Sequence, residues 1–485
     1  MMSSDFDKKP DEESNTRQTG SVLIGTLQDV EVQDEVFGAI SKDGPNYRAL
    51  GWKGSIVVML KTQIGLGILT IPKAFQVLGL ILGTICVIVI ASMITWSNCI
   101  IGSFKLRHPS VYGIEDVGRI FLGRFGYEFF GWLFAISSAS FIGLSTCLNA
   151  LSEHGACTAI FVVVVGIMGF SLGSIQTLGR ISWLAWVGIS SIFSAGKCKV
   201  MVVTISVGVG DRPASAPSSD KPFISDYVLF ANPSPAEAFA AVSTIIFSFA
   251  GTPAFFNIVS EMRDPRMYTR AVLICQSIMS ALYITIGIVV YYFCGSYVSS
   301  PALGSGGPLM KKICYGLALP GLTVSSAMFV HVSCSNDYVI VLAKFQAQFT
   351  GKYLFLRFMR GSPHLTKNTV THWAVWIGCT GGNALLAYIV ASAVPVLDGL
   401  VSLVGAFGGT LMSLQPMGAM WIYDNWKGGR TTLWVLTFVW VMFVIAMGSL
   451  MTVAGSYGAI VGIINDYKAA GGSAAWTGAD NSGST

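Results

Sequence analysis

About eleven runs of roughly 20 mostly apolar residues constrain this chain more than any other feature of its sequence. A helix of that length is long enough to cross the hydrocarbon core of a bilayer. Lipid offers no hydrogen-bond partner to a backbone amide or carbonyl, so each run is expected to be helical. The sequence therefore predicts an all-α, polytopic membrane protein. The runs lie near residues 53–78, 80–104, 127–151, 156–174, 181–209, 236–260, 272–297, 313–343, 370–394, 397–422 and 432–464.

The composition agrees with this fold class and disfavours an enzyme. Hydrophobic residues make up 53% of the 485 and charged residues only 11%, which is far from the composition of a soluble domain. The sequence has no phosphate loop, metal-ligand cluster or nucleophile elbow, and its ten cysteines are scattered. We therefore expect no cofactor, no metal and no nucleic-acid partner, and the lipid bilayer is the predicted surrounding.

The two ends of the chain and the connecting loops differ in charge. Residues 1–50 are polar and acidic and lack a basic-then-apolar start, which predicts a disordered tail and not a signal peptide. Lys and Arg are concentrated after the second, fourth, sixth, eighth and tenth runs. Because cytoplasmic loops are enriched in these residues, we expect the N-terminal tail to be cytosolic and the short flexible tail 466–485 to be external.

The first apolar run is interrupted by residues that disfavour a helix. Gly65 and Gly67 cost backbone entropy in a helix, and Pro72 lacks an amide donor. We expect the backbone to unwind around residues 65–68. Unwound backbone is tolerated at membrane depth only where it is buried in protein or lines a wet cavity, so this stretch predicts a substrate cradle.

The sixth run carries a matching interruption. Gly251 and Pro253 predict unwinding around residues 249–252. Two interrupted spans five runs apart predict a 5+5 inverted repeat. Repeat 1 would cover about 53–209, repeat 2 about 236–422, and an additional helix about 432–464.

The two interruptions offer complementary groups for an amino acid. A half-helix that begins near Ile68 presents free amides and a positive dipole end to a carboxylate. Carbonyls freed around residues 62–65 and 249–250 suit an ammonium, so no fixed side-chain charge is required. The alternative is that the glycines only permit close helix packing. The candidate substrate-binding residues are Thr62, Gln63, Ile64, Gly65, Leu66, Gly67, Ile68, Ser248, Phe249, Ala250, Gly251 and Thr252.

Ionisable residues within the apolar runs are candidates for carrying a coupled proton. Lys197 lies in the middle of the fifth run, where a local irregularity, including an error in the gene model, is the alternative explanation. His331 in the eighth run is the second candidate, because an unperturbed imidazole titrates near physiological pH, and a histidine that only packs is the alternative. Asp337 is the third candidate, or else it pairs with a nearby basic residue. Lys61, one turn before the first break, is expected to extend toward the cytosolic surface.

Four motifs give the chain a family resemblance. They are TQIGLGILTIP in the first run, FSFAGTPAFFNIVSEMRDP in the sixth, RFMRGSPHLTKNTVTHW before the ninth and SLQPMGAMWIYDNW at the end of the tenth. With these motifs the chain resembles the amino acid/auxin permease family. Within that family it is most similar to the fungal neutral amino acid permeases of the methyltryptophan-resistance type.

The resemblance implies a fold like that of the bacterial leucine transporter. It also implies proton-driven uptake of neutral aliphatic and aromatic amino acids across the plasma membrane, with residues 62–65 meeting the substrate. The sixth run departs from the wider family, because Thr252 and Asn257 stand where many members have His and Glu. A vacuolar exporter of the same fold and a non-transporting amino acid sensor are the alternatives that remain open.

Overall fold

The structure of the chain is a computed structural model. It describes residues 50–64, 67–138, 223–298 and 397–469, together with short pieces and isolated positions elsewhere. Apart from two-residue strands β1 (Gln33–Asp34) and β2 (Gly38–Ala39), which pair antiparallel, the described elements are helical. The predicted all-α class is confirmed. The helices are α1 (Trp52–Gln63), α2 (Gly67–Leu78), α3 (Leu80–Arg107), α4 (Ile114–Ser138), α8 (Pro235–Ser248), α9 (Thr252–Glu261), η1 (Pro265–Met267), α10 (Tyr268–Cys294), η2 (Gly295–Tyr297), α14 (Leu397–Val404), η5 (Gly405–Gly409), α15 (Thr410–Ser413), α16 (Gln415–Asn425), α17 (Thr432–Leu450), η6 (Met451–Gly455) and α18 (Ser456–Ala469).

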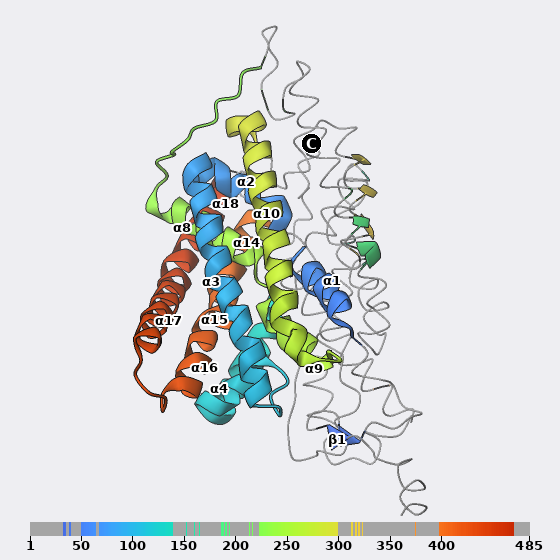
Figure 1. The fold of residues 1–485 in the computed structure, drawn as a ribbon. Coiled ribbons are helices and arrows are strands. Elements are labelled where there is room, and N and C mark those ends of the chain that lie inside the picture. Colours follow the sequence, from blue (N-terminus) through green and yellow to red (C-terminus); the bar gives the residue numbers. More distant parts are fainter. Residues whose placement is uncertain are drawn as a thin grey trace, which may run out of the picture.

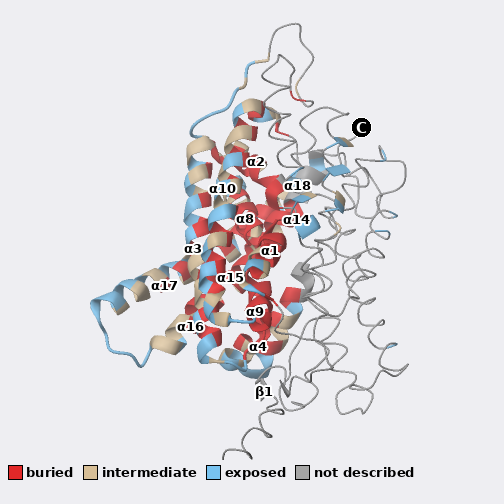
Figure 2. Cartoon of the chain, turned by 45° about the vertical axis from the view of Figure 1, so that its right-hand side comes forward, coloured by how far each residue is buried: buried red, intermediate tan, exposed pale blue. Residues whose placement is uncertain are grey.

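Five helical stretches in the described part are long and apolar enough to cross a bilayer. They are Leu80–Arg107, Pro235–Glu261, Pro265–Tyr297, Gly399–Asn425 and Thr432–Asn465. Each coincides with a predicted run. The last of them is the least buried, and Figure 2 shows α17 standing away from the buried centre of the bundle. Its exposed Leu433, Leu436 and Val439 are suited to lipid contact.

Both predicted interruptions are present. In the first run, α1 ends at Gln63 and α2 begins at Gly67, with residues 65 and 66 outside the described part. The break is shorter than expected, because Gly67 and Ile68 are already helical. In the sixth run, α8 ends at Ser248 and α9 begins at Thr252.

Local sequence explains where the second pair of half-helices begins. The Ser234 hydroxyl accepts a hydrogen bond from the Glu237 amide at 3.4 Å, and the Glu237 carboxylate accepts from the Ser234 amide at 2.9 Å. This reciprocal pairing caps α8, with Pro235 as its first residue. Pro253 likewise lies in the first turn of α9, where its missing amide donor costs nothing.

Small residues let α2 pack closely between α3 and α10, the two long helices that run side by side in Figure 1. The Phe75 ring of α2 fills the space left by Gly83 of α3 and Gly287 of α10. A Cβ at Gly287 would lie 2.5 Å from the ring and one at Gly83 would lie 3.1 Å from it. The second half of the first span is therefore held by side-chain packing against two complete helices.

The N-terminal end of α1 is tied to the C-terminal end of α9. Leu50 forms a parallel β-bridge with Met262. The Leu50 amide donates to the Glu261 carbonyl at 3.4 Å, and the Arg263 amide donates to the Leu50 carbonyl at 2.9 Å. The Arg270 guanidinium also lies 5.3 Å from the centre of the Trp52 ring. These contacts join the start of the first interrupted span to the end of the second.

Helix α4 corrects one predicted boundary. The sequence places a span at 127–151, whereas the helix begins at Ile114 and is kinked at Gly123, where φ is +61°. Arg119 and Arg124 keep this first part out of any apolar run, so hydropathy alone finds only the later part. The Asp116 carboxylate accepts hydrogen bonds from the Tyr112 and Gly113 amides at 2.9 and 3.4 Å and fixes the start of the helix.

Asp116 lies outside the predicted spans, and its ionisation is expected to affect stability. Burial raises the pKa of its carboxyl to about 6, against the opposing effect of the two amide donors. Because the folded-state pKa exceeds the ordinary value, protonation of the Asp116 carboxyl stabilises the folded protein. This stabilisation is fully present at low pH and is lost as pH rises through about 6. We expect Asp116→Asn to raise the Tm of the purified protein above pH 6 and to lose that advantage below pH 4. A difference in Tm that is the same at all pH values would contradict this prediction.

Candidate functional site

The C-terminal ends of α1 and α8 meet at one buried tyrosine. Tyr283, from α10, has its hydroxyl 2.7 Å from the carbonyl of Ser248 and 3.2 Å from the carbonyl of Gln63. Each of these carbonyls belongs to the last residue of its half-helix. Such carbonyls lack an intrahelical partner and lie at the negative end of the helix dipole. Tyr283 therefore connects the two interruptions.

The side chain of Gln63 makes a second connection. Its Nε2 donates to the Phe249 carbonyl at 3.3 Å, and its Oε1 lies 3.9 Å from the Cys275 thiol of α10. A Cβ at Gly251 would lie 2.7 Å from Gln63 Cγ. Gly251 is therefore needed because any larger residue there would clash with the Gln63 side chain.

Gly67 and Ser248 form the third connection. The Ser248 hydroxyl lies 3.2 Å from the Gly67 carbonyl and 3.0 Å from the Thr244 carbonyl. A Cβ at Gly67 would lie only 2.5 Å from Ser248 Cα. Gly67 thus permits close packing of α2 against α8, which is the alternative explanation that the sequence left open.

Lys61 is placed differently from the prediction. Its side chain is 1% exposed and does not extend toward the surface. Its Nζ donates to the Ile64 carbonyl at 3.1 Å, at the C-terminal end of α1. A lysine side chain is favoured at this end of a helix because it can donate to the last carbonyls, which lack an intrahelical partner. The structure therefore brings the Lys61 amino group to the first break.

The remaining candidates divide into buried and undescribed residues. Ile64 and Ile68 are buried, and the Thr62 hydroxyl donates to its own helix at the Met59 carbonyl. The Thr252 hydroxyl, at the start of α9, is buried with no hydrogen-bond partner in the described part. Gly65, Leu66, Lys197, His331 and Asp337 lie outside the described residues.

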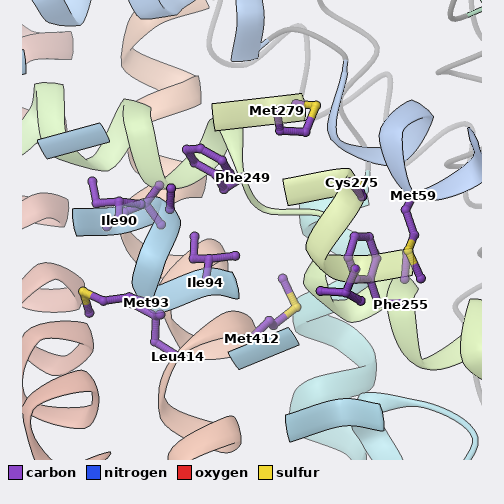
Figure 3. Close-up of a cluster of buried hydrophobic side chains, with 14 of the residues drawn as sticks. Met59, Ile90, Met93, Ile94, Phe249, Phe255, Cys275, Met279, Met412 and Leu414 are labelled. Carbon is purple, nitrogen blue, oxygen red and sulfur yellow. The ribbon is translucent and has the colours of Figure 1, made fainter. Parts of the chain in front are cut away.

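Apolar side chains surround these polar contacts. The Phe249 ring lies edge-on to the Tyr283 ring, with centroids 5.0 Å apart. Figure 3 shows Met59, Phe255 and Cys275 gathered from α1, α9 and α10, and all three are fully buried. Hydrogen bonds in such a dry environment are stronger than in water, and an unsatisfied carbonyl is correspondingly costly.

A cavity of about 200 Å³ lies beside the half-helices, between α2, α8, α14 and α18. Lys73, Glu237, Thr244, Ser402 and Asn465 are among its lining residues. Thr244 precedes Ser248 by one helical turn, so the cavity reaches to within one turn of the second break.

Sequence reasoning did not identify Tyr283. It lies in a long apolar run that contains several tyrosines, and it is 220 positions from Gln63. A tyrosine in an apolar helix has no signature that separates a polar contact from packing. The only available signal was the expectation that a buried hydroxyl needs a partner.

Two interrupted helices that face each other in a polytopic helical bundle define a class of membrane transporter, in which substrates bind at unwound segments. Residues 48–461 match the family described as transmembrane amino acid transporter protein. The chain belongs to this family.

Individual relatives cover nearly the whole chain. A transmembrane transporter of Gibberella moniliformis is 33% identical, with 91% of this chain and 90% of that protein covered. The N amino acid transport system protein of Neurospora crassa is 28% identical, with 94% and 93% covered. A solved structure of a Na⁺-coupled sialic acid symporter is 13% identical, covers 86% of this chain and 91% of its own, and has a TM-score of 0.49. At that level the structural likeness decides nothing about this chain.

Proposed function

We propose that the protein is a proton-coupled symporter of neutral aliphatic and aromatic amino acids, of the methyltryptophan-resistance type, in the plasma membrane. The observation that carries the proposal is the meeting of four half-helix ends at one buried point. The negative ends of α1 and α8 lie beside the positive ends of α2 and α9, as the contacts of Gln63 with Gly251 and of Ser248 with Gly67 indicate. A zwitterion matches both kinds of end.

The apolar surroundings support a neutral substrate. Phe249, Phe255 and Met59 offer no partner to a charged side chain, and burying an unpaired charge there is costly. The name of the Neurospora crassa relative, an N amino acid transport system protein, agrees with an amino acid substrate. The proposed transporter domain is residues 51–465, between a cytosolic tail at 1–50 and a flexible tail at 466–485.

Proton coupling requires a group whose protonation changes the balance between outward and inward states. Lys197, His331 and Asp337 remain the proposed candidates. Neutral substitution of the residue that carries the proton is expected to flatten the pH dependence of uptake, whereas substitution of a bystander leaves it unchanged.

The test is uptake of radiolabelled leucine and phenylalanine in a host that lacks its own amino acid uptake. We expect saturable uptake that unlabelled neutral amino acids inhibit and that lysine and glutamate do not. A protonophore should abolish accumulation, and replacing sodium by choline should leave it unchanged. Host cells without this protein serve as the control for background uptake.

Three outcomes would contradict the proposal in different ways. Uptake that requires sodium and is unaffected by the protonophore would exclude proton coupling. The candidate sodium ligands would then be the carbonyls of the first break and the hydroxyls of Ser325, Ser326 and Ser333. Efflux from vacuolar vesicles without uptake at the cell surface would indicate an exporter. Substrate binding without flux, with signalling that depends on residues 1–50, would indicate a sensor.

A further inference from the structure

Tyr283 has one hydroxyl proton and two carbonyl oxygens within reach. The distances to the Ser248 and Gln63 carbonyls are 2.7 and 3.2 Å, so one donor is shared between two acceptors. The ring is fixed in this position, because Tyr283 is 0% exposed and packs edge-on against Phe249. The hydroxyl therefore separates from the two carbonyls only when the ends of α1 and α8 shift relative to α10.

The position between the two carbonyls favours a positive charge. Both oxygens terminate half-helices, so two negative dipole ends face the same point. A neutral hydroxyl satisfies one acceptor at a time and carries no net charge. A primary ammonium has three N–H donors and satisfies both carbonyls together.

We propose that Tyr283 is a positioning residue that holds the end carbonyls of α1 and α8 together in the empty transporter and yields them to the substrate ammonium. This inference rests on the proposed function, since it needs an amino acid as the ligand. The tyrosine is an internal competitor of the substrate. Its hydroxyl sets how tightly the ammonium binds and how well the two breaks are aligned before binding.

The first test is Tyr283→Phe, which keeps the ring and its packing against Phe249 while removing the hydroxyl. The end carbonyls lose their donor in the empty protein, and the leucine ammonium no longer has to displace one. We expect the KM for leucine to fall about fivefold, the equivalent of one net hydrogen bond, and the maximal rate to fall as release slows. A purely structural role would lower the maximal rate and leave KM unchanged.

Tyr268→Phe is the matched control. Tyr268 lies on the same helix and is fully buried, but its hydroxyl has no hydrogen-bond partner in the described part. Its ring packs against Gly102 of α3. We expect the KM for leucine to stay within about twofold of the wild type, because no donor is removed from either carbonyl.

A second variant changes the donor strength, keeps the hydroxyl and replaces only one ring hydrogen of the tyrosine. Incorporation of 3-fluorotyrosine at position 283 makes the hydroxyl a stronger hydrogen-bond donor. We expect the KM to rise about two- to threefold, the direction opposite to that of Tyr283→Phe. Opposite shifts in KM would support competition. An unchanged KM in the fluorotyrosine protein would overturn the inference. This test still applies if the Phe variant does not reach the membrane.

A binding measurement separates this inference from the proposed function. The leucine-induced rise in Tm of purified protein is compared with that produced by 4-methylpentanoate, which lacks the ammonium. We expect Tyr283→Phe to change the response to leucine and not that to the acid. If the wild type binds leucine but does not transport it, the proposed function fails and this comparison still holds. If all variants respond to leucine alike, the inference fails.

Discussion

Gly67→Leu is expected to abolish uptake, because the first atom of the new side chain has no room. A Cβ at position 67 would lie 2.5 Å from Ser248 Cα and 2.7 Å from its hydroxyl oxygen. Backbone atoms cannot rotate away as a flexible side chain can, so α2 and α8 must separate. Overpacking of this kind costs about 1–3 kcal/mol in a well-packed core. We expect uptake to fall at least about tenfold, since the separation occurs where the two breaks are aligned.

The measurement combines uptake, surface abundance and the Tm of the substrate-free protein. If close packing is the reason for the glycine, Gly67→Ala should already lower the Tm. If Gly67 only provides space for the substrate, Gly67→Ala should leave that Tm unchanged. Gly429→Leu is the control, because nothing lies within 4 Å of a Cβ there. Normal uptake by Gly67→Leu would mean that the two half-helices are not in contact in the working transporter.

Lys61→Met should also reduce uptake at least about tenfold, although the side chain keeps nearly the same length. The substitution removes the Lys61 Nζ donor from the Ile64 carbonyl at the end of α1. Loss of a donor to a buried acceptor costs about 1–3 kcal/mol. The cost arises at the break itself, so we expect the effect on transport to exceed the effect on surface abundance.

Lys53→Met is the matched control on the same helix. Lys53 is exposed, with its Nζ 5.7 Å from the centre of the Trp52 ring. We expect its substitution to change uptake less than about twofold. Lys61→Arg should recover part of the activity, because it restores a charged donor in a bulkier form. Equal uptake by Lys61→Met and Lys53→Met would show that the buried ammonium is dispensable for transport.

The sequence predicted the interrupted helices because their cause is local. Gly251 and Pro253 act on the backbone within a few residues, and their effect does not depend on the rest of the fold. The bounds of α3, of α10 and of the Thr432–Asn465 stretch were likewise close to the hydropathy runs, since lipid imposes a length that can be counted. The start of α4 was missed because it lies beyond the apolar run.

The partners of the breaks were not predictable in the same way. The sequence allowed the Lys61 side chain to reach either the membrane surface or the end of a helix, and only the tertiary fold decides between the two. Tyr283 reaches both breaks from a helix that is far away in the sequence. Its role depends on the packing angle of α10 against α1, which no single-residue property encodes. The coupling candidates in the fifth and eighth runs remain predictions.

The pairing of Leu50 with Met262 has a consequence for how this protein can vary over evolution. The two bonds join main-chain atoms, from the Leu50 amide to the Glu261 carbonyl and from the Arg263 amide to the Leu50 carbonyl. Any residue other than proline at positions 50 and 263 can supply the amides, and any residue at 261 can supply the carbonyl. These two hydrogen bonds between α1 and α9 can therefore be kept while the side chains at these positions change. They impose no covariation between side chains and are recognised only from the backbone structure.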